Sequence, residues 1–220
     1  MVAAGEEIIG VRREGRVAGY VWKSDLADGP LGDVARGFPA DQILASTAPL
    51  SDVILILTHY DHCFITVMDS VAGVVARKDT EKPIVRMWLF GMITMMEMNM
   101  VARIRRRWPG ESWTQFCGPK RLEKARAVHD ERKRRDQESE LLDCLQFADK
   151  ARIVLHDPEQ MAEFGFDSRR AADSAISDLE SLRNNLAHGQ DIATYDWPQI
   201  VRMTQQIERL VLSSRRESAR

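Results

Sequence analysis

Two stretches near the N-terminus repeat each other and constrain the fold more than any other feature of the chain. Residues 17–25 read VAGYVWKSD and residues 71–79 read VAGVVARKD, so Asp25 recurs as Asp79, 54 residues later. At the same offset the pair Glu14-Gly15 falls on Met68-Asp69, between runs rich in β-branched and aromatic residues. Such runs on either side of a two-residue turn favour a β-hairpin. Each copy therefore predicts a strand, a tight turn, a second strand and a helix start at the aspartate.

The segment in front of the second copy predicts a helix. Residues 50–57 are apolar and follow Ser46-Thr47-Ala48-Pro49, which is typical helix-start chemistry. At the repeat offset, the matching segment of the first copy falls at or before residue 7, so the first copy lacks its opening half. We expect the open sheet edge of the first copy to be covered, since bare edges invite pairing with other chains.

The predicted order resembles the CBS domain, a β-α-β-β-α module that usually occurs as a tandem pair and often senses adenosine nucleotides. The resemblance covers residues 1–83, with the first repeat incomplete, and implies that Asp25 and Asp79 hold ribose hydroxyls. Trp22 and Ala76 stand where nucleotide-binding members carry the Ser or Thr that contacts phosphate. The residues themselves therefore leave a second interpretation open, in which both aspartates are helix N-caps.

From Pro83 onward the pattern becomes helical. Apolar residues recur at spacings of three and four and predict one core-facing stripe on a helix that ends at Pro109-Gly110; they are Met87, Phe90, Thr94, Met98 and Val101. The apolar run is interrupted by polar residues and is shorter than the ~20 residues of a membrane span, so no membrane segment is predicted. Further helices are expected at 121–135, 139–154 and 159–164, after Ser168 up to Gly189, and after Trp197-Pro198. Residues 84–220 thus predict a bundle of four to five helices.

The end of the helix after Ser168 carries the most informative motif, LRNNLAHG at residues 182–189. The series Arg183-Asn184-x-x-x-His188 resembles the signature of the HEPN domain, a helical bundle that in many members is a metal-independent ribonuclease acting on single-stranded RNA. The resemblance implies a homodimer whose two protomers form the site, with RNA as the partner and no metal cofactor. It also implies that His188 is the general acid or base, that Arg183 binds the scissile phosphate, and that Asn184 orients it. The resemblance further implies that Glu97 is the additional polar residue that some HEPN sites contribute; a solvent-facing glutamate is the alternative that stays open.

Helix geometry only partly favours this site. Asn184 and His188 are four residues apart and share a face, whereas Arg183 and His188 are about 140° apart on a regular helix. Either Arg183 reaches across, or the helix unwinds at its end, or two chains combine their residues. A structural alternative stays open, in which His188 interacts with the helix dipole and Arg183 pairs with Glu180 or Asp178.

The distribution of charge marks one basic region. Net charges of −4, +8 and −6 fall on residues 1–102, 103–135 and 136–220. Within the basic region, Arg132, Lys133, Arg134 and Arg135 offer contacts to an RNA backbone, although few aromatic residues accompany them for base stacking. A solvated helix with salt-bridged charges explains the same run.

Several classes of protein are not expected. The three cysteines form no CxxC pair, so the sequence predicts neither a disulfide framework nor a four-thiolate zinc site. The N-terminus lacks the pattern of a secretory signal, so a cytoplasmic location is expected. The sequence thus predicts an α+β protein of two domains, 1–83 and 84–220. Its expected function is single-stranded RNA cleavage modulated by a CBS-like module; the alternative is a non-catalytic regulatory or interaction protein, in which the two domains mediate dimerisation or the sensing of a nucleotide or RNA.

Overall fold

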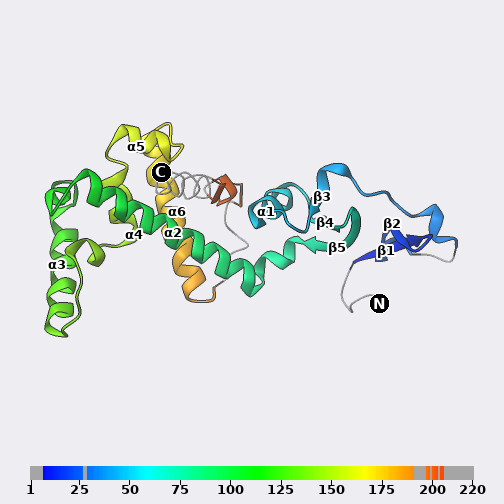
Figure 1. Cartoon of the computed structure of the whole chain (residues 1–220), viewed down its shortest axis with the longest axis horizontal. Coiled ribbons are helices and arrows are strands. Elements are labelled where there is room, and N and C mark those ends of the chain that lie inside the picture. Colours follow the sequence, from blue (N-terminus) through cyan, green and yellow to red (C-terminus); the bar gives the residue numbers. More distant parts are fainter. Residues whose placement is uncertain (1–6, 27–28, 191–196, 199, 203, 206–220) are drawn as a thin grey trace. The chain divides into compact units, whose positions relative to one another are not determined.

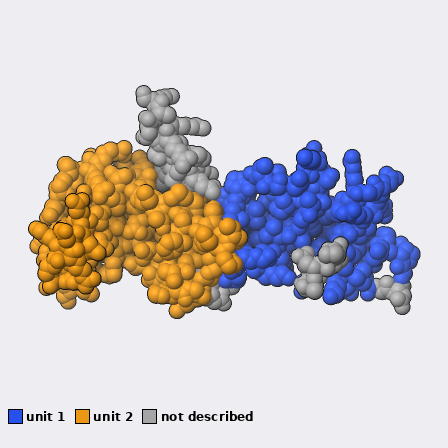
Figure 2. Space-filling model, turned by 60° about the horizontal axis from the view of Figure 1, so that its bottom comes forward, with its two compact units in different colours: residues 1–82 blue, residues 83–220 orange. Residues whose placement is uncertain are grey.

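The chain is an α+β protein that divides into two compact units, residues 1–82 (unit 1) and 83–220 (unit 2) (Figure 2). The computed structural model describes residues 7–26, 29–190, 197–198, 200–202 and 204–205. The division falls one residue before the boundary that the change in periodicity indicates.

Unit 1 contains two hairpins that match at the repeat offset. The first joins β1 (Ile8–Arg13) to β2 (Arg16–Trp22), and the second joins β4 (His62–Val67) to β5 (Ser70–Ala76) (Figure 1). Val11 pairs with Gly19 before a bulge, and Ile65 pairs with Gly73 before a bulge at the same place. Both residues of each turn have positive φ, as two-residue hairpin turns require. The predicted hairpins are confirmed, and the sequence repeat is also a repeat of register.

The second hairpin belongs to a larger sheet. β3 (Ile43–Ala45) runs parallel to β4, giving the order β3-β4-β5, and α1 (Leu50–His59) packs on it around Val53, Leu57 and Cys63. The first hairpin forms a separate two-stranded sheet whose strand β2 lies against β5. Short 3-10 turns complete unit 1: η1 (Lys23–Asp25), η2 (Leu31–Asp33), η3 (Ala40–Gln42) and η4 (Arg77–Glu81).

The first hairpin is covered at one point of its edge. Tyr20 exchanges two backbone hydrogen bonds with Arg36, at 2.9 and 2.8 Å. Beside it, a Cβ on Gly19 would lie 2.5 Å from the Arg36 carbonyl oxygen. Only glycine allows this approach, so the covering of the edge depends on a residue without a side chain.

Unit 2 is built around the long helix α2 (Pro83–Arg107), which packs against α4 (Phe147–Val154) and α6 (Arg169–Ala187). α3 (Pro119–Arg134) contacts the turn η6 (Leu141–Cys144), and α5 (Pro158–Glu163) precedes α6 (Figure 1). A further turn, η5 (Ser112–Phe116), buries Trp113. The residues described between 197 and 205 are helical.

The predicted helices are present as α1, α2, α3, α5 and α6, and two details of the helix predictions need correction. The helix expected at 139–154 is split, because the extended residues Leu145 and Gln146 separate η6 from α4. Phe90 and the methionines at 87 and 98, predicted to face the core, lie on the exposed side of α2. Ser168 caps α6 as predicted, its hydroxyl accepting a hydrogen bond from the Ala171 backbone N–H at 3.2 Å.

α2 is longer than the apolar run suggested. Among the helices in the described part of the chain, it alone has the length and composition that could cross a membrane. Seven of its residues, from Val85 to Ile104, are buried in the structure. Core helices of globular proteins pass the same test of length and composition.

Candidate functional sites

The Arg183-Asn184-x-x-x-His188 motif lies in the last turns of α6. His188 is the C-cap, and Gly189 follows with a φ of 67°. The Gln190 N–H donates to the Asn185 carbonyl at 2.9 Å, and the Gly189 N–H donates to the Leu186 carbonyl at 3.5 Å. This left-handed closing turn satisfies the last carbonyls of the helix. The backbone alone therefore ends α6 at this position.

The side chains of the motif are accessible. Asn184 and His188 are exposed and Arg183 is half-buried. Within the part of the chain that the structure describes, none of the three side chains forms a hydrogen bond or an ion pair. Arg183 therefore does not make the ion pair with Glu180 or Asp178 that a structural role would use. The fold gives these three polar side chains no bonding role there.

Arg86 on α2 holds the end of α6 in place. Its Nη2 donates to the Asn185 carbonyl oxygen at 3.1 Å. A cation at the C-terminal end of a helix interacts favourably with the helix dipole. The role of Arg86 does not follow from the sequence, because the only signal is a lone arginine 99 residues away from Asn185.

The backbone of α6 is regular through Ala187, so the helix does not unwind between Arg183 and His188. Their side chains leave a regular helix about 140° apart. One chain therefore presents Asn184 and His188 on a shared face, and Arg183 on a neighbouring one.

Glu97 is held by a buried lysine. Its Oε1 accepts from Lys150 Nζ at 2.7 Å, and the two side chains are 20% and 7% exposed. A buried ammonium needs such a partner, because an unpaired charge in the interior is costly. Glu97 was expected to contribute to the RNA site, whereas its contact in the structure joins α2 to α4.

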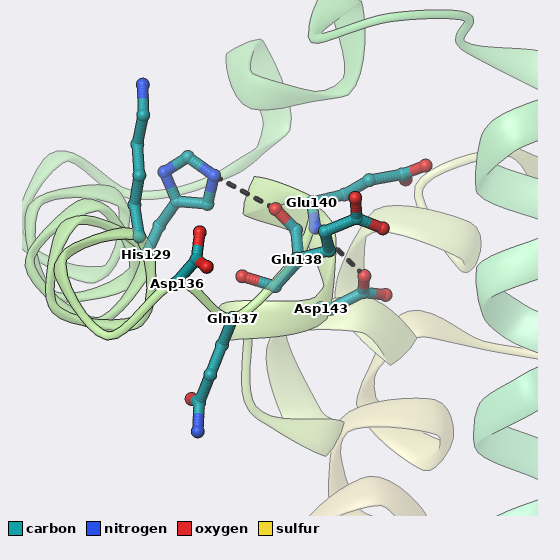
Figure 3. Close-up of a pocket in the computed structure, with 8 residues that line it drawn as sticks. His129, Asp136, Gln137, Glu138, Glu140 and Asp143 are labelled. Carbon is teal, nitrogen blue, oxygen red and sulfur yellow. Dashed lines mark hydrogen bonds between the residues drawn. The ribbon is translucent and has the colours of Figure 1, made fainter.

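The basic run at the end of α3 is partly neutralised. Arg134 and Arg135 both pair with Glu131, and Arg132 points one Nη toward the Cys144 sulfur at 3.8 Å. Beside them lies an open cavity of about 550 Å³, where the end of α3 meets η6 (Figure 3). Its lining contains four carboxylates next to Lys133: Asp136, Glu138, Glu140 and Asp143. These negative charges weaken the attraction of the run for an RNA backbone.

Unit 1 contains a second candidate site, a cavity of about 330 Å³ between the two hairpins. Three pairs of lining residues are equivalent at the repeat offset: Glu7 and Asp61, Ile8 and His62, Trp22 and Ala76. Arg77, Lys78 and Asp79 lie on its lining together with Val74. The pocket, which has charged and apolar walls, is thus built by the same positions of both repeats.

His62 is the unusual residue of this pocket. Its side chain lies among aromatic rings, with ring centroids 5.0 Å from Trp22 and 5.1 Å from Phe64, and the residue is only 7% exposed. Among the residues that the structure describes, neither ring nitrogen has a hydrogen-bond partner. Burial lowers the pKa of His62, and the nearby charge of Asp61 opposes that shift. The pocket therefore contains a neutral imidazole with one donor and one acceptor left for a ligand.

The two aspartates of the repeat differ from their predicted role as N-caps. Asp79 lies inside η4, where its Oδ2 accepts from the Ala76 N–H at 2.8 Å and its Oδ1 pairs with Lys82 at 2.7 Å. Asp25 ends η1 and pairs with Arg36 at 2.7 Å. The N-cap prediction is therefore wrong for both positions. Partial burial would raise the pKa of Asp79, but its hydrogen bonds and the charges of Lys82 and Lys78 lower it.

Metal and thiol chemistry find little support in the described part of the chain. No group of three His, Cys, Asp or Glu side chains is placed to hold a metal ion there. Burial raises the pKa of the Cys63 thiol to about 11, so Cys63 stays protonated near neutral pH.

Comparison with family models, with curated proteins and with solved structures found no match for this chain.

Proposed function

We propose that the chain is an RNA-cleaving protein whose site is the exposed end of α6, with Arg183, Asn184 and His188 as its working residues. The observation that carries the proposal is that none of these side chains has a bonding partner in the described part of the chain. A structural explanation of Arg183 uses an ion pair with Glu180 or Asp178, and neither ion pair is formed in the described part of the chain. The resemblance of the motif to the HEPN signature supplies the reaction class.

The residue types suit cleavage of RNA at a 2′-hydroxyl. His188 takes the proton of the hydroxyl, whose oxygen attacks phosphorus while the bond from phosphorus to the 5′ oxygen breaks and that oxygen takes up a proton. The products are a 2′,3′-cyclic phosphate and a 5′-hydroxyl. Arg183 binds the phosphate with paired N–H donors and Asn184 orients it. In a homodimer, Arg183 of one protomer and His188 of its partner act on the same phosphate.

The test uses the full chain and a fluorescent single-stranded RNA, in EDTA, with DNA of the same sequence as a substrate that lacks the hydroxyl. We expect cleavage of RNA only, and a loss of at least about 100-fold in His188→Ala. His59→Ala, which removes an exposed histidine of unit 1, serves as the matched control. Wild-type protein that leaves every RNA intact, or His188→Ala with full activity, would contradict the proposal.

Glu97→Gln separates a structural from a catalytic carboxylate. Because Glu97 pairs with buried Lys150, we expect the variant to lower the melting temperature of unit 2. We expect His188→Ala to change the free energy of unfolding by no more than about 0.5 kcal/mol, as is usual for a surface substitution. A Glu97→Gln protein that melts like wild type but no longer cuts RNA would instead place Glu97 in the reaction.

A second function, the sensing of a small ligand by unit 1, is favoured by the unpartnered ring nitrogens of His62. The resemblance to CBS domains makes adenosine or its phosphates the ligand to test. The cavity offers His62 for hydrogen bonds to the base and Trp22 as an aromatic wall. Asp79 is already bonded to Ala76 and Lys82, so adenosine needs to displace part of that network to use the carboxylate for its ribose.

Thermal unfolding with adenosine, AMP and ATP tests this second function. A ligand that binds only the folded state raises the melting temperature with its concentration. We expect His62→Phe to abolish the rise and the matched variant His59→Phe to keep it. Binding of a nucleotide in this pocket would be contradicted if the melting temperature of wild type did not rise, or if it rose equally in both variants.

A further inference from the structure

Helix α2 is apolar on two opposite sides. One side carries the buried residues of the bundle, from Val85 to Ile104. The other carries a row that we name the outer stripe: Ile84, Met87, Gly91, Thr94, Met98 and Val101. Ile84, Met87 and Met98 are 67%, 70% and 67% exposed, and Phe90 and Met95 flank the row. An exposed apolar row of this length on one helix is typical of an interaction surface.

The spacing of the outer stripe is that of a helix–helix seam. Its members are separated by 3, 4, 3, 4 and 3 residues, which is the a/d pattern of a coiled coil. The stripe carries no charged residue. The only hydroxyl in it, that of Thr94, donates to the Phe90 carbonyl of the same helix at 2.9 Å and leaves its methyl group for packing. The partner is therefore expected to be another apolar helix face.

The side chains of the outer stripe follow the same order of sizes from either end of the stripe. In an antiparallel pair of copies, a positions face d positions, so Ile84 meets Val101 of the second copy, Met87 meets Met98, and Gly91 meets Thr94. Branched residues pair at the ends, methionines pair inside them, and small residues meet at the centre, where the two backbones approach most closely. A surface that complements itself under a twofold axis is the requirement for an isologous dimer.

Charge selects the antiparallel orientation. Three arginines, Arg105 to Arg107, close α2, and a parallel pair would place six of them at one end. The antiparallel pair separates the two clusters by the length of the helix and places opposite ends of the helix dipoles together. The stripe is about 26 Å long, so it buries less than the ~800 Å² per partner of a standard interface. A dimer that dissociates at micromolar concentrations is expected.

We propose that the outer stripe of α2 joins two copies of this chain in an antiparallel pair. This inference goes beyond the proposed function and does not depend on it. Sedimentation velocity of the full chain between about 1 and 100 μM, around the expected dissociation constant, measures the dimer. We expect Met87→Glu and Met98→Lys each to be monomeric, because each places two charges in the seam. Met68→Glu, at an exposed hairpin turn where Met68 is 94% exposed, is the matched control and should stay dimeric.

Mixing the two monomeric variants tests the orientation. In the antiparallel pair, Glu at 87 of one chain faces Lys at 98 of the other, and the second layer keeps its two methionines, so the mixture should recover the dimer. A mixture that stays monomeric overturns the antiparallel pairing. Three results would overturn a second copy as the partner of the outer stripe. They are wild type that stays monomeric at the highest concentration, Met87→Glu that dimerises like wild type, and binding to phosphatidylcholine vesicles by wild type but not by Met87→Glu. Circular dichroism confirms that each variant is folded.

Discussion

The β1–β2 and β4–β5 hairpins have the same backbone register and the same bulge, yet equivalent residues have different surroundings. Gly19 lies against the Arg36 carbonyl, whereas nothing lies within 4 Å of a Cβ built on Gly73. Tyr20 and Val21 are buried, whereas Val74 and Val75 are half-buried. A hairpin is determined by its turn and its pairing pattern, which are local. The role of each side chain depends on the segments that cover the hairpin, and these differ between the copies.

The largest difference is expected at the glycines. Gly19→Ala forces its Cβ against the Arg36 carbonyl and should cost about 1–3 kcal/mol of stability. Gly73→Ala has open space, and alanine restricts the unfolded chain, so it should stabilise by about 0.5 kcal/mol. Thermal unfolding and hydrogen exchange of the β1–β2 segment measure both. If the two substitutions changed stability equally, the covering of β2 by Arg36 would contribute nothing to the stability of the protein.

A smaller difference is expected at the aspartates. Asp79→Asn weakens the cap on Ala76 and removes the pairing with Lys82, so it should cost about 1 kcal/mol at pH 7. Asp25→Asn removes an exposed ion pair with Arg36 and should cost less than about 0.5 kcal/mol. Because the pKa of folded Asp79 is lowered, its contribution is present above the ordinary aspartate pKa and is lost as the pH falls through the folded value. Asp79→Asn should therefore converge toward wild type in acid.

The sequence predicted what is local. The hairpin turns, the Ser168 cap and the end of α6 at Gly189 follow from residue types at fixed spacings, and the structure confirms them. An apolar stripe of α2 from Met87 to Val101 was also predicted, but as a face toward the core, whereas Met87, Phe90 and Met98 are exposed. α2 is apolar on two sides, and periodicity alone does not tell which side the bundle covers.

Contacts between distant segments were not predictable from one sequence. Glu97 was chosen as a site residue because it is an isolated acid in an apolar helix. Its partner Lys150 lies 53 residues away, and no pattern connects the two.

The expected nucleotide site included Asp79, with Trp22 and Ala76 beside it, and all three line the pocket of unit 1. His62 was not expected there, because its equivalent in the first copy is Ile8 and no repeated pattern marks the histidine. His62 stands in the segment His59-Tyr60-Asp61-His62-Cys63, and no group of three metal-ligating side chains is formed in the described part of the chain.

The smallest effect is expected at Ile8 and His62, which occupy equivalent positions of the repeat. Only His62 titrates. The pKa of folded His62 is lowered by burial, so the unfolded chain binds a proton below about pH 6.5 that the folded chain does not. Stability of unit 1 should therefore be constant above that pH and fall as the solution is acidified toward pH 5. His62→Ile gives the second hairpin the residue that the first has at this position, and it should reduce the loss of stability in acid. His59→Ile, at an exposed position of α1, should leave that loss unchanged. If both variants keep the slope of wild type, the acid sensitivity arises elsewhere and folding does not change the proton affinity of His62. A ligand that hydrogen-bonds to the neutral ring would make the loss of stability in acid larger, because it binds the folded state and opposes the protonation of His62.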